Sequence, residues 1–254
     1  MKVYDIITKI EDFAPQSLAC SWDNPGFLCG DKNREVNKIL LALDVDLETV
    51  YEAIEGGADM IVSHHPIFFS GLKRIDFSTP EGRMVELLIK NDIAVFAAHT
   101  NMDAAKDGIN DKLAEIFELS EVKVLEPIDE GVGIGRFGVL KEEISAEDFC
   151  NTVKEKLNTP FVRLTGNGSI KKLAICSGSG GEYFSYAKEN GCDALLTGDV
   201  KYHTAIEAKE SGIAVIDAGH FPTEKIVCSI FEEILSNLPL TLIKSKSRDI
   251  FEIK

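Results

Sequence analysis

The chain lacks the features that mark several common classes of protein. No apolar run in its 254 residues approaches membrane-spanning length, and the start, MKVYDIITKIEDFAP, mixes acidic side chains into a helical apolar stripe. There are only eight prolines and no low-complexity tract, which argues against extended disorder. The six cysteines show no C-x-x-C spacing, so a zinc ribbon and a thioredoxin-like motif are excluded, and we expect reduced thiols. Together these features predict a cytoplasmic protein.

Positive charge is also scarce. The chain has 27 basic residues against 42 acidic ones, a formal net charge of −15. Such a charge repels polyanions, so we expect neither a nucleic acid nor an anionic membrane as the main partner. A small-molecule substrate remains the expectation.

A glycine-rich stretch, CSGSGG at 176–181, follows a predicted strand and opens a predicted helix. The backbone amides of Gly178–Gly181 could form an anion-binding nest. However, the stretch has neither the G-K-[ST] of a P-loop nor the G-x-G-x-x-G spacing of a dinucleotide site. A tight strand-to-helix turn is the simpler interpretation, and the sequence leaves the choice open.

Apolar segments of strand length alternate with segments of helical periodicity through most of the chain. This alternation predicts βαβ units and largely parallel sheets covered on both faces. One series runs from KILLALDV at 38–45 to GINDKLAEIFEL at 108–119, and a second runs from KLAICSG at 172–178 to LTLIKS at 240–245. We therefore expect an α/β protein.

The two series resemble each other. Residues 56–65 can be laid over 190–199, and residues 91–103 over 211–224, which predicts two related α/β lobes with mainly parallel central sheets. The alternative is that any two βαβ units look alike in sequence. The glycines in EPIDEGVGIGRFGVLKEEISAEDF, 126–149, predict a linker that leads into an added strand and helix, with a lobe boundary near residue 126.

The five histidines lie close to the predicted strand ends. His64 and His65 close one strand, His99 closes the next, His220 follows the last of the second series, and His203 lies a short step past a strand. Ligands of parallel α/β sheets bind beyond the carboxyl ends of strands. These positions therefore predict a shared site.

Carboxylates accompany these histidines. Asp103 follows His99 by four residues, and Glu224 follows His220 by four, with Pro222 suited to the first turn of a helix that His220 would cap. Each acid alone could serve as an ordinary helix N-terminal charge. Neighbouring side chains of an extended strand point to opposite faces, so His64 and His65 are better placed to serve two ions than one. Jointly the three clusters favour a metal site.

The expected ligand set contains imidazole and carboxylate without thiolate. It suits Zn, Fe, Mn, Co or Ni and does not discriminate among them. A centre of two such ions could lower the pKa of a bridging water, which makes hydrolysis the expected class of reaction.

Five motifs in this order resemble the Nif-three-like dinuclear metal-binding family, whose members are often labelled GTP cyclohydrolase type 2 homologues. The motifs are WDNPGF, SHHPIFF, AAHTNMD, GDVKYH and DAGHFPTE, and they span nearly the whole chain. The resemblance implies a Nif-three-like fold with a discontinuous metal-binding lobe, 1–125 plus 215–254, and a second lobe, 126–214. It also implies a homo-oligomer, a toroidal hexamer built as a trimer of dimers.

The resemblance further implies two divalent ions per subunit. His64 and His65 would bind one ion each, Asp103 and His220 would complete the separate shells, and Glu224 would bridge the ions. His99 and His203 would face the substrate or contact the residues that bind the ions.

Two functions remain open at this point. One is a hydrolase in which metal-bound hydroxide attacks the ring of a purine nucleotide while His99 or His203 shuttles protons. The other is a non-catalytic metal carrier, chaperone or scaffold. A shared fold does not decide between them.

Overall fold

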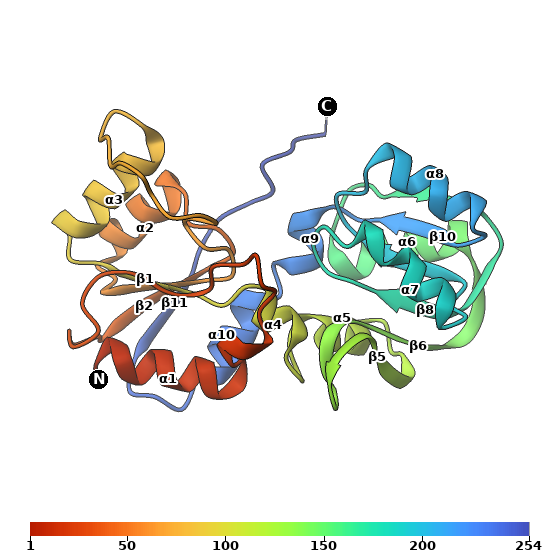
Figure 1. The fold of residues 1–254 in the computed structure, drawn as a ribbon, viewed down its shortest axis with the longest axis horizontal. Coiled ribbons are helices and arrows are strands. Elements are labelled where there is room, and N and C mark those ends of the chain that lie inside the picture. The colour runs from red at the N-terminus through yellow and green to blue at the C-terminus, as the bar shows by residue number, and fades with distance from the viewer. Residues whose placement is uncertain (254) are drawn as a thin grey trace. The chain divides into compact units, whose positions relative to one another are not determined.

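The computed structural model describes residues 1–253 and divides the chain into two compact α/β units, each drawn in Figure 1. The first unit comprises Met1–Ala105 and Val227–Arg248. The second comprises Lys106–Ile226 together with the C-terminal tail from Asp249. The predicted α/β class is confirmed.

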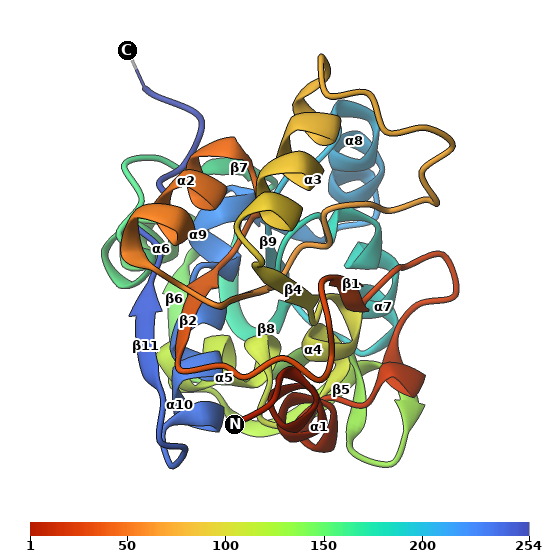
Figure 2. The same cartoon turned by 90° about the vertical axis from the view of Figure 1, so that its left-hand side faces the viewer.

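The first unit contains a five-stranded sheet in the order β1-β4-β3-β2-β11, in which only β1 is antiparallel to its neighbour. Figure 2 shows α2 and α3 on one side of this sheet and α1 and α10 on the other. The elements of this unit are α1 (Val3–Phe13), η1 (Gln16–Leu18), β1 (Gly26–Cys29), β2 (Lys38–Ala42), α2 (Leu47–Gly56), β3 (Met60–Ser63), α3 (Pro80–Lys90), β4 (Ala94–Ala97), α4 (Thr100–Ala104), α10 (Val227–Leu235) and β11 (Thr241–Lys244).

Local sequence explains these helices. The apolar stripe of α1 places four residues on one buried face, namely Val3, Ile6, Ile7 and Ile10. Helix α2 begins where the Asp46 side chain accepts the Thr49 amide at 2.7 Å, and it ends at Gly57, whose φ of 64° suits glycine. All residues of β3 and β4 are buried, as expected for parallel strands with helices on both faces.

The second unit contains a six-stranded sheet in the order β5-β6-β8-β9-β10-β7. Strands β8, β9 and β10 are parallel, whereas β5, β6 and β7 run antiparallel to their neighbours. The elements are α5 (Ile109–Ile116), β5 (Ser120–Asp129), β6 (Val132–Ser145), α6 (Ala146–Leu157), β7 (Arg163–Thr165), β8 (Ser169–Ile175), η2 (Gly181–Tyr183), α7 (Phe184–Glu189), β9 (Ala194–Thr197), α8 (Tyr202–Glu210), β10 (Ala214–Asp217) and α9 (His220–Glu224).

The two sheets repeat one arrangement. In the first unit β2, β3 and β4 are joined through α2 and α3, and in the second β8, β9 and β10 are joined through α7 and α8. In each unit a short antiparallel strand pairs with the third strand, β1 with β4 and β7 with β10. The sequence segments that resemble each other fall on β3 and β9 and on β4 and β10, which agrees with two related lobes.

The glycine-rich stretch from residue 126 is not a linker, so that part of the prediction was wrong, whereas the added strand and helix are present as β6 and α6. It forms most of a long hairpin, β5 and β6, at the edge of the second sheet, followed by α6. A Cβ atom on Gly133 would lie 2.1 Å from the Glu126 carbonyl oxygen, so this glycine permits close strand pairing. The hairpin begins at Ser120 and β10 ends at Asp217, so the second sheet extends past both predicted lobe boundaries.

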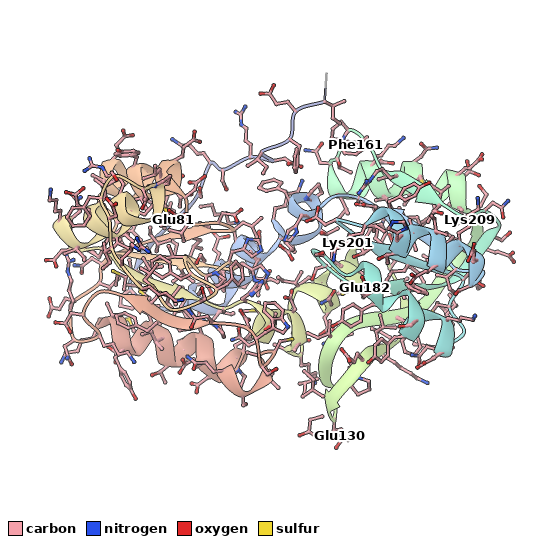
Figure 3. All side chains as sticks on the ribbon, turned by 45° about the horizontal axis from the view of Figure 1, so that its top comes forward. Glu81, Glu130, Phe161, Glu182, Lys201 and Lys209 are labelled. Atoms are coloured by element: carbon pink, nitrogen blue, oxygen red, sulfur yellow. The ribbon has the colours of Figure 1, made fainter. Side chains whose placement is uncertain are left out.

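The exposed surface carries charges that suit the helix dipoles. Glu81 lies in the first turn of α3 and Lys209 in the last turn of α8, and both are labelled in Figure 3. Within residues 1–253, no helix combines the length and the apolar character needed to cross a bilayer.

Candidate metal-binding site

Three histidines of the first unit form one cluster at the carboxyl ends of β3 and β4. The ring centroids of His64 and His65 lie 5.0 Å apart. The ring centroid of His99 lies 5.1 Å from that of His64 and 5.3 Å from that of His65. β3 and β4 are adjacent parallel strands, so their carboxyl ends meet at one edge of the sheet. Each residue offers a ring nitrogen within 4.8 Å of the others, so the cluster could hold a metal ion.

The cluster depends on a bend that the sequence did not reveal. β3 ends at Ser63, and the chain bends at His64 and His65 rather than continuing as a regular strand. Their amides still donate to the carbonyls of Ala42 and Leu43, at 3.2 and 2.9 Å. The expected alternation of extended side chains therefore does not apply, and both rings turn toward the same place.

The Nδ1 atom of each ring in this cluster is held by an acceptor. For His64 it is the Ala98 carbonyl at 2.8 Å, for His65 it is Asp44 at 2.7 Å, and for His99 it is Asp23 at 2.8 Å. A carbonyl or carboxylate can only accept, so each Nδ1 carries a proton, and in the neutral ring Nε2 is left with the lone pair. Metal-binding histidines are oriented in the same way by outer-shell acceptors.

A carboxylate also faces this cluster. Asp103 lies in the first turn of α4, which begins directly after His99, and it is 9% exposed. Its Oδ1 lies 3.8 Å from Nε2 of His64. The carboxylate of Asp103 thus approaches the imidazole of His64 within one unit, whereas the predicted pair was Asp103 with His99.

The carboxylate of Asp23 accepts four hydrogen bonds. Its Oδ1 accepts from His99 and from the Asn24 amide, and its Oδ2 accepts from the Thr100 hydroxyl at 2.6 Å and the Thr100 amide at 3.1 Å. Burial raises its pKa, but the hydrogen bonds from His99 and Thr100 outweigh that effect and lower the pKa to about 2. Asp23 therefore stays charged and holds His99 in one orientation.

A second group lies in the second unit, on the short helix α9. Nε2 of His220 lies 2.8 Å from Oε2 of Glu224, four residues later, and Nδ1 of His220 lies 2.8 Å from Oδ2 of Asp199. Glu224 is 3% exposed. The N-cap is Gly219, with a φ of 86°, so His220 is the first helical residue and not the predicted cap. The two side chains still meet on one side of the turn, as predicted.

The CSGSGG stretch packs against this second group. Its amides donate to protein oxygens: Ser177 to Asn110 at 2.9 Å, Gly178 to Thr223 at 3.0 Å and Gly180 to Thr197 at 3.0 Å. Gly178 has a φ of 60°, and a Cβ atom there would lie 1.9 Å from Oε1 of Glu224. These contacts favour the tight-turn interpretation over an anion nest.

His203 lies apart from these groups. It is exposed on α8, and its ring makes an edge contact with Tyr202 at 5.6 Å between centroids. Within residues 1–253 it belongs to no group of three or more potential ligand residues. Its predicted role near the substrate stays a prediction.

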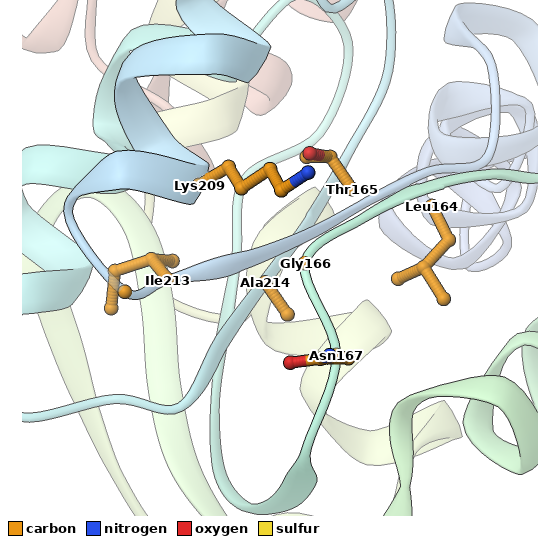
Figure 4. A pocket seen from close by; sticks show the side chains of 8 residues that line it. Leu164, Thr165, Gly166, Asn167, Lys209, Ile213 and Ala214 are labelled. Carbon is orange, nitrogen blue, oxygen red and sulfur yellow. The ribbon is translucent and has the colours of Figure 1, made fainter.

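The second unit also contains a hollow of about 400 Å³ (Figure 4). It is lined by residues around β7 and the start of β10, namely Leu164, Thr165, Gly166, Asn167, Lys209, Gly212, Ile213 and Ala214. These residues surround the amino end of β10, whereas His220 follows its carboxyl end. Parallel sheets bind ligands at the carboxyl end, so we do not assign this hollow to the site.

Sequence reasoning missed the three aspartates that hold the histidines. Asp44 and Asp199 follow the ends of β2 and β9, and Asp23 precedes β1. The signal that could have found two of them is a position just past the carboxyl end of a strand, the same signal that marked the histidines. Because β2 lies beside β3 and β9 beside β10, acids at the carboxyl ends of β2 and β9 reach histidines that follow the neighbouring strand. That rule would have found Asp44 and Asp199.

The ligand chemistry fits divalent ions. Both groups offer imidazole Nε2 atoms with Nδ1 bonded, and both have carboxylate oxygens nearby. Such nitrogen and oxygen sets suit Zn, Fe, Mn, Co and Ni. Fold and ligands together define a two-unit α/β protein whose His and acidic clusters are consistent with metal binding.

The chain belongs to the Duf34/NIF3 (NGG1p interacting factor 3) family, whose sequence profile matches residues 1–249. It is 39% identical over 260 residues to a "GTP cyclohydrolase 1 type 2 homolog" of Clostridium perfringens, with 99% of each chain covered. The family resemblance predicted from the motifs is thereby confirmed.

Solved structures agree. A Bacillus cereus protein related to NIF3 matches with a TM-score of 0.92 at 26% identity, covering 100% of this chain and 99% of that one. Reduced HcgD from Methanocaldococcus jannaschii matches with a TM-score of 0.86 at 35% identity, covering 97% and 98%. The predicted Nif-three-like fold is confirmed.

Proposed function

We propose that the protein is a metal-dependent hydrolase that binds two divalent ions and acts on a purine nucleotide. The proposed ligands are those implied by the motifs, namely His64, His65, Asp103, His220 and Glu224. The observation that carries this proposal is the common arrangement of the histidines, in which an acceptor holds each Nδ1. Nε2 is then the ring nitrogen that would bind an ion, which in His220 would replace the contact between Nε2 and Glu224.

The reaction class rests on two supports. The curated relatives are named GTP cyclohydrolase 1 type 2 homologues, which is a statement about those proteins and supports a nucleotide substrate here. The nitrogen and oxygen ligand set supports hydrolysis, because divalent ions bound by such ligands act as Lewis acids and make water more acidic.

The chain's own residues would orient ligands and move protons. Asp23 fixes His99 with Nδ1 protonated, so Nε2 of His99 can take a proton from water or substrate. The charged carboxylate then stabilises the imidazolium that forms. His203 is the second predicted proton-transfer group, and its exposed position on α8 leaves it accessible.

Metal content and turnover test the proposal together. Protein purified without chelator and reloaded with Zn, Fe, Mn, Co or Ni should contain close to two ions per chain by elemental analysis, and His64→Ala and Glu224→Ala should each contain fewer. His203→Ala should retain both ions. The metal-loaded protein should release formate from GTP, whereas His64→Ala and His203→Ala should not.

Other results would contradict parts of the proposal. Less than one ion per chain after reloading would contradict the metal site. Two ions with facile transfer to an acceptor and no turnover of nucleotides would contradict the hydrolase and favour a carrier.

The proposed assembly is the toroidal hexamer that the resemblance implies. Light scattering should then give a mass near six times the 27.9 kDa of the chain. A monomer at micromolar concentration would contradict it.

A further inference from the structure

Two exposed aromatic rings flank His99 in the first unit. Trp22 is the only tryptophan in the chain and is 61% exposed, and Phe69 is 55% exposed. The Trp22 ring lies 5.9 Å from the His99 ring at 76°, and the Phe69 ring lies 5.6 Å away at 68°. Single exposed aromatics are common, but two against one buried imidazole of a ligand cluster require an explanation.

The loops that carry these rings are fixed to each other. Asn24, two residues after Trp22, donates its side-chain amide to the Phe68 carbonyl at 2.7 Å. On the other side of Trp22, the Cys20 amide donates to the Thr100 hydroxyl at 2.9 Å. Asp23 itself makes the four bonds described above. Both rings are therefore presented on anchored backbone and lose little conformational freedom when they bind a ligand.

We propose that Trp22 and Phe69 form a stacking platform that holds the planar ring of a nucleobase next to His99. This inference rests on the proposed nucleotide substrate and assigns the residues that recognise its base. Aromatic side chains bind nucleobases through their π-faces, and both residues here are more than half exposed.

The charge of the protein supports recognition through the ring. With a net charge of −15, the chain gains little long-range attraction for nucleotide phosphates. Stacking on an uncharged aromatic face does not depend on this charge. The platform would thus supply affinity and place the base ring beside Nε2 of His99, the proton-transfer atom of the proposed reaction.

The single tryptophan makes the proposal directly measurable. Excitation at 295 nm reports Trp22 alone, with or without metal ions and without turnover. In protein freed of metal ions, guanosine and GTP should quench this fluorescence and protect Trp22 from acrylamide, whereas inorganic tripolyphosphate and ribose 5-phosphate should leave it unchanged.

Substitutions test the second ring and supply a matched control. Phe69→Leu should weaken guanosine binding at least about fivefold, the lower end of what one stacked base contributes. Phe77→Leu removes a ring of nearly equal exposure, 56%, from the same loop between β3 and α3, and should leave binding unchanged. Trp22→Ala, measured by equilibrium dialysis, should bind more weakly than Trp22→Phe.

Three outcomes would overturn the platform. The first is no quenching by guanosine at millimolar concentration, and the second is an equal effect of Phe69→Leu and Phe77→Leu on guanosine binding. The third is dissociation of an oligomer in Trp22→Ala or Phe69→Leu, which would assign the rings to a contact with another copy of the chain. Failure of the proposed function looks different, because quenching by guanosine would persist in a protein that lacks ions or turnover.

Discussion

Nδ1 of His99 donates to Oδ1 of Asp23 across 2.8 Å, although 76 residues separate the two in sequence. The pairing of β1 with β4 brings them together. Gly26 lies opposite Ala97 in this antiparallel register, so residues just before β1 lie beside residues just after β4. A strand of four residues therefore positions the carboxylate that orients the histidine.

The low pKa of Asp23 predicts a pH-dependent contribution to stability. Its pKa is about 2 in the folded protein against 3.8 for an ordinary Asp, so its stabilising effect is present above pH 4 and is lost as the pH falls toward 2. The shift corresponds to about 2 kcal/mol. Urea unfolding in EDTA should show that Asp23→Asn is less stable at pH 6 and that the difference shrinks below pH 4. A difference that stays constant from pH 6 to pH 2 would refute this account.

The aspartates behind His65 and His220 should control metal affinity. Asparagine at Asp44 or Asp199 can turn a donor toward Nδ1 and thus favours the wrong tautomer at Nε2. We expect Asp44→Asn and Asp199→Asn to lower affinity for divalent ions about 10- to 100-fold in competition with a chelating indicator. Asp12→Asn, which removes an exposed acid on α1, is the control and should bind normally. Unchanged affinity in both test variants would show that these aspartates do not orient ligands.

Gly178 should be required for the position of Glu224. Alanine there would place a Cβ atom 1.9 Å from Oε1 of Glu224 and also strain a φ of 60°. Gly191→Ala is the matched control, because Gly191 has a φ of 67° and its Cβ would meet nothing within 4 Å. Both variants should lose about 1–2 kcal/mol of stability, and only Gly178→Ala should lose metal by elemental analysis. Equal metal content in the two variants would contradict the role of Glu224.

The thiols of buried Cys192 and partly buried Cys228 should react slowly. Burial raises the pKa of Cys192 and of Cys228 to about 11, from an ordinary 9.0, so little thiolate exists at pH 8. The difference of about two pKa units predicts alkylation about 100-fold slower than for an ordinary thiol, before steric protection is counted. Mass spectrometry of iodoacetamide-treated protein should show this, with rapid labelling of both cysteines after unfolding. Labelling of Cys228 in the folded protein as fast as in the unfolded chain would count against its burial.

Features that depend on the local strand pattern could be predicted from the sequence, whereas contacts between residues far apart in the chain could not. His64 and His99 were predicted to lie together because adjacent parallel strands bring their carboxyl ends to one edge of a sheet, and the same rule placed His220 at the carboxyl end of a strand in the second sheet. Asp23 was missed because its partner depends on the register of a short antiparallel strand, which the pattern of residues does not encode. Gly133 was misread because a glycine that permits close strand pairing looks, in sequence, like a glycine in a linker.

The central claim is that the acceptor-held histidines present Nε2 to divalent ions. Anomalous diffraction from metal-loaded crystals, recorded at the absorption edge of the bound metal, tests it most directly. The account predicts two anomalous peaks per chain, ligated by Nε2 of His64, His65 and His220. Peaks ligated through Nδ1, or no peak near these three side chains in fully loaded protein, would contradict it.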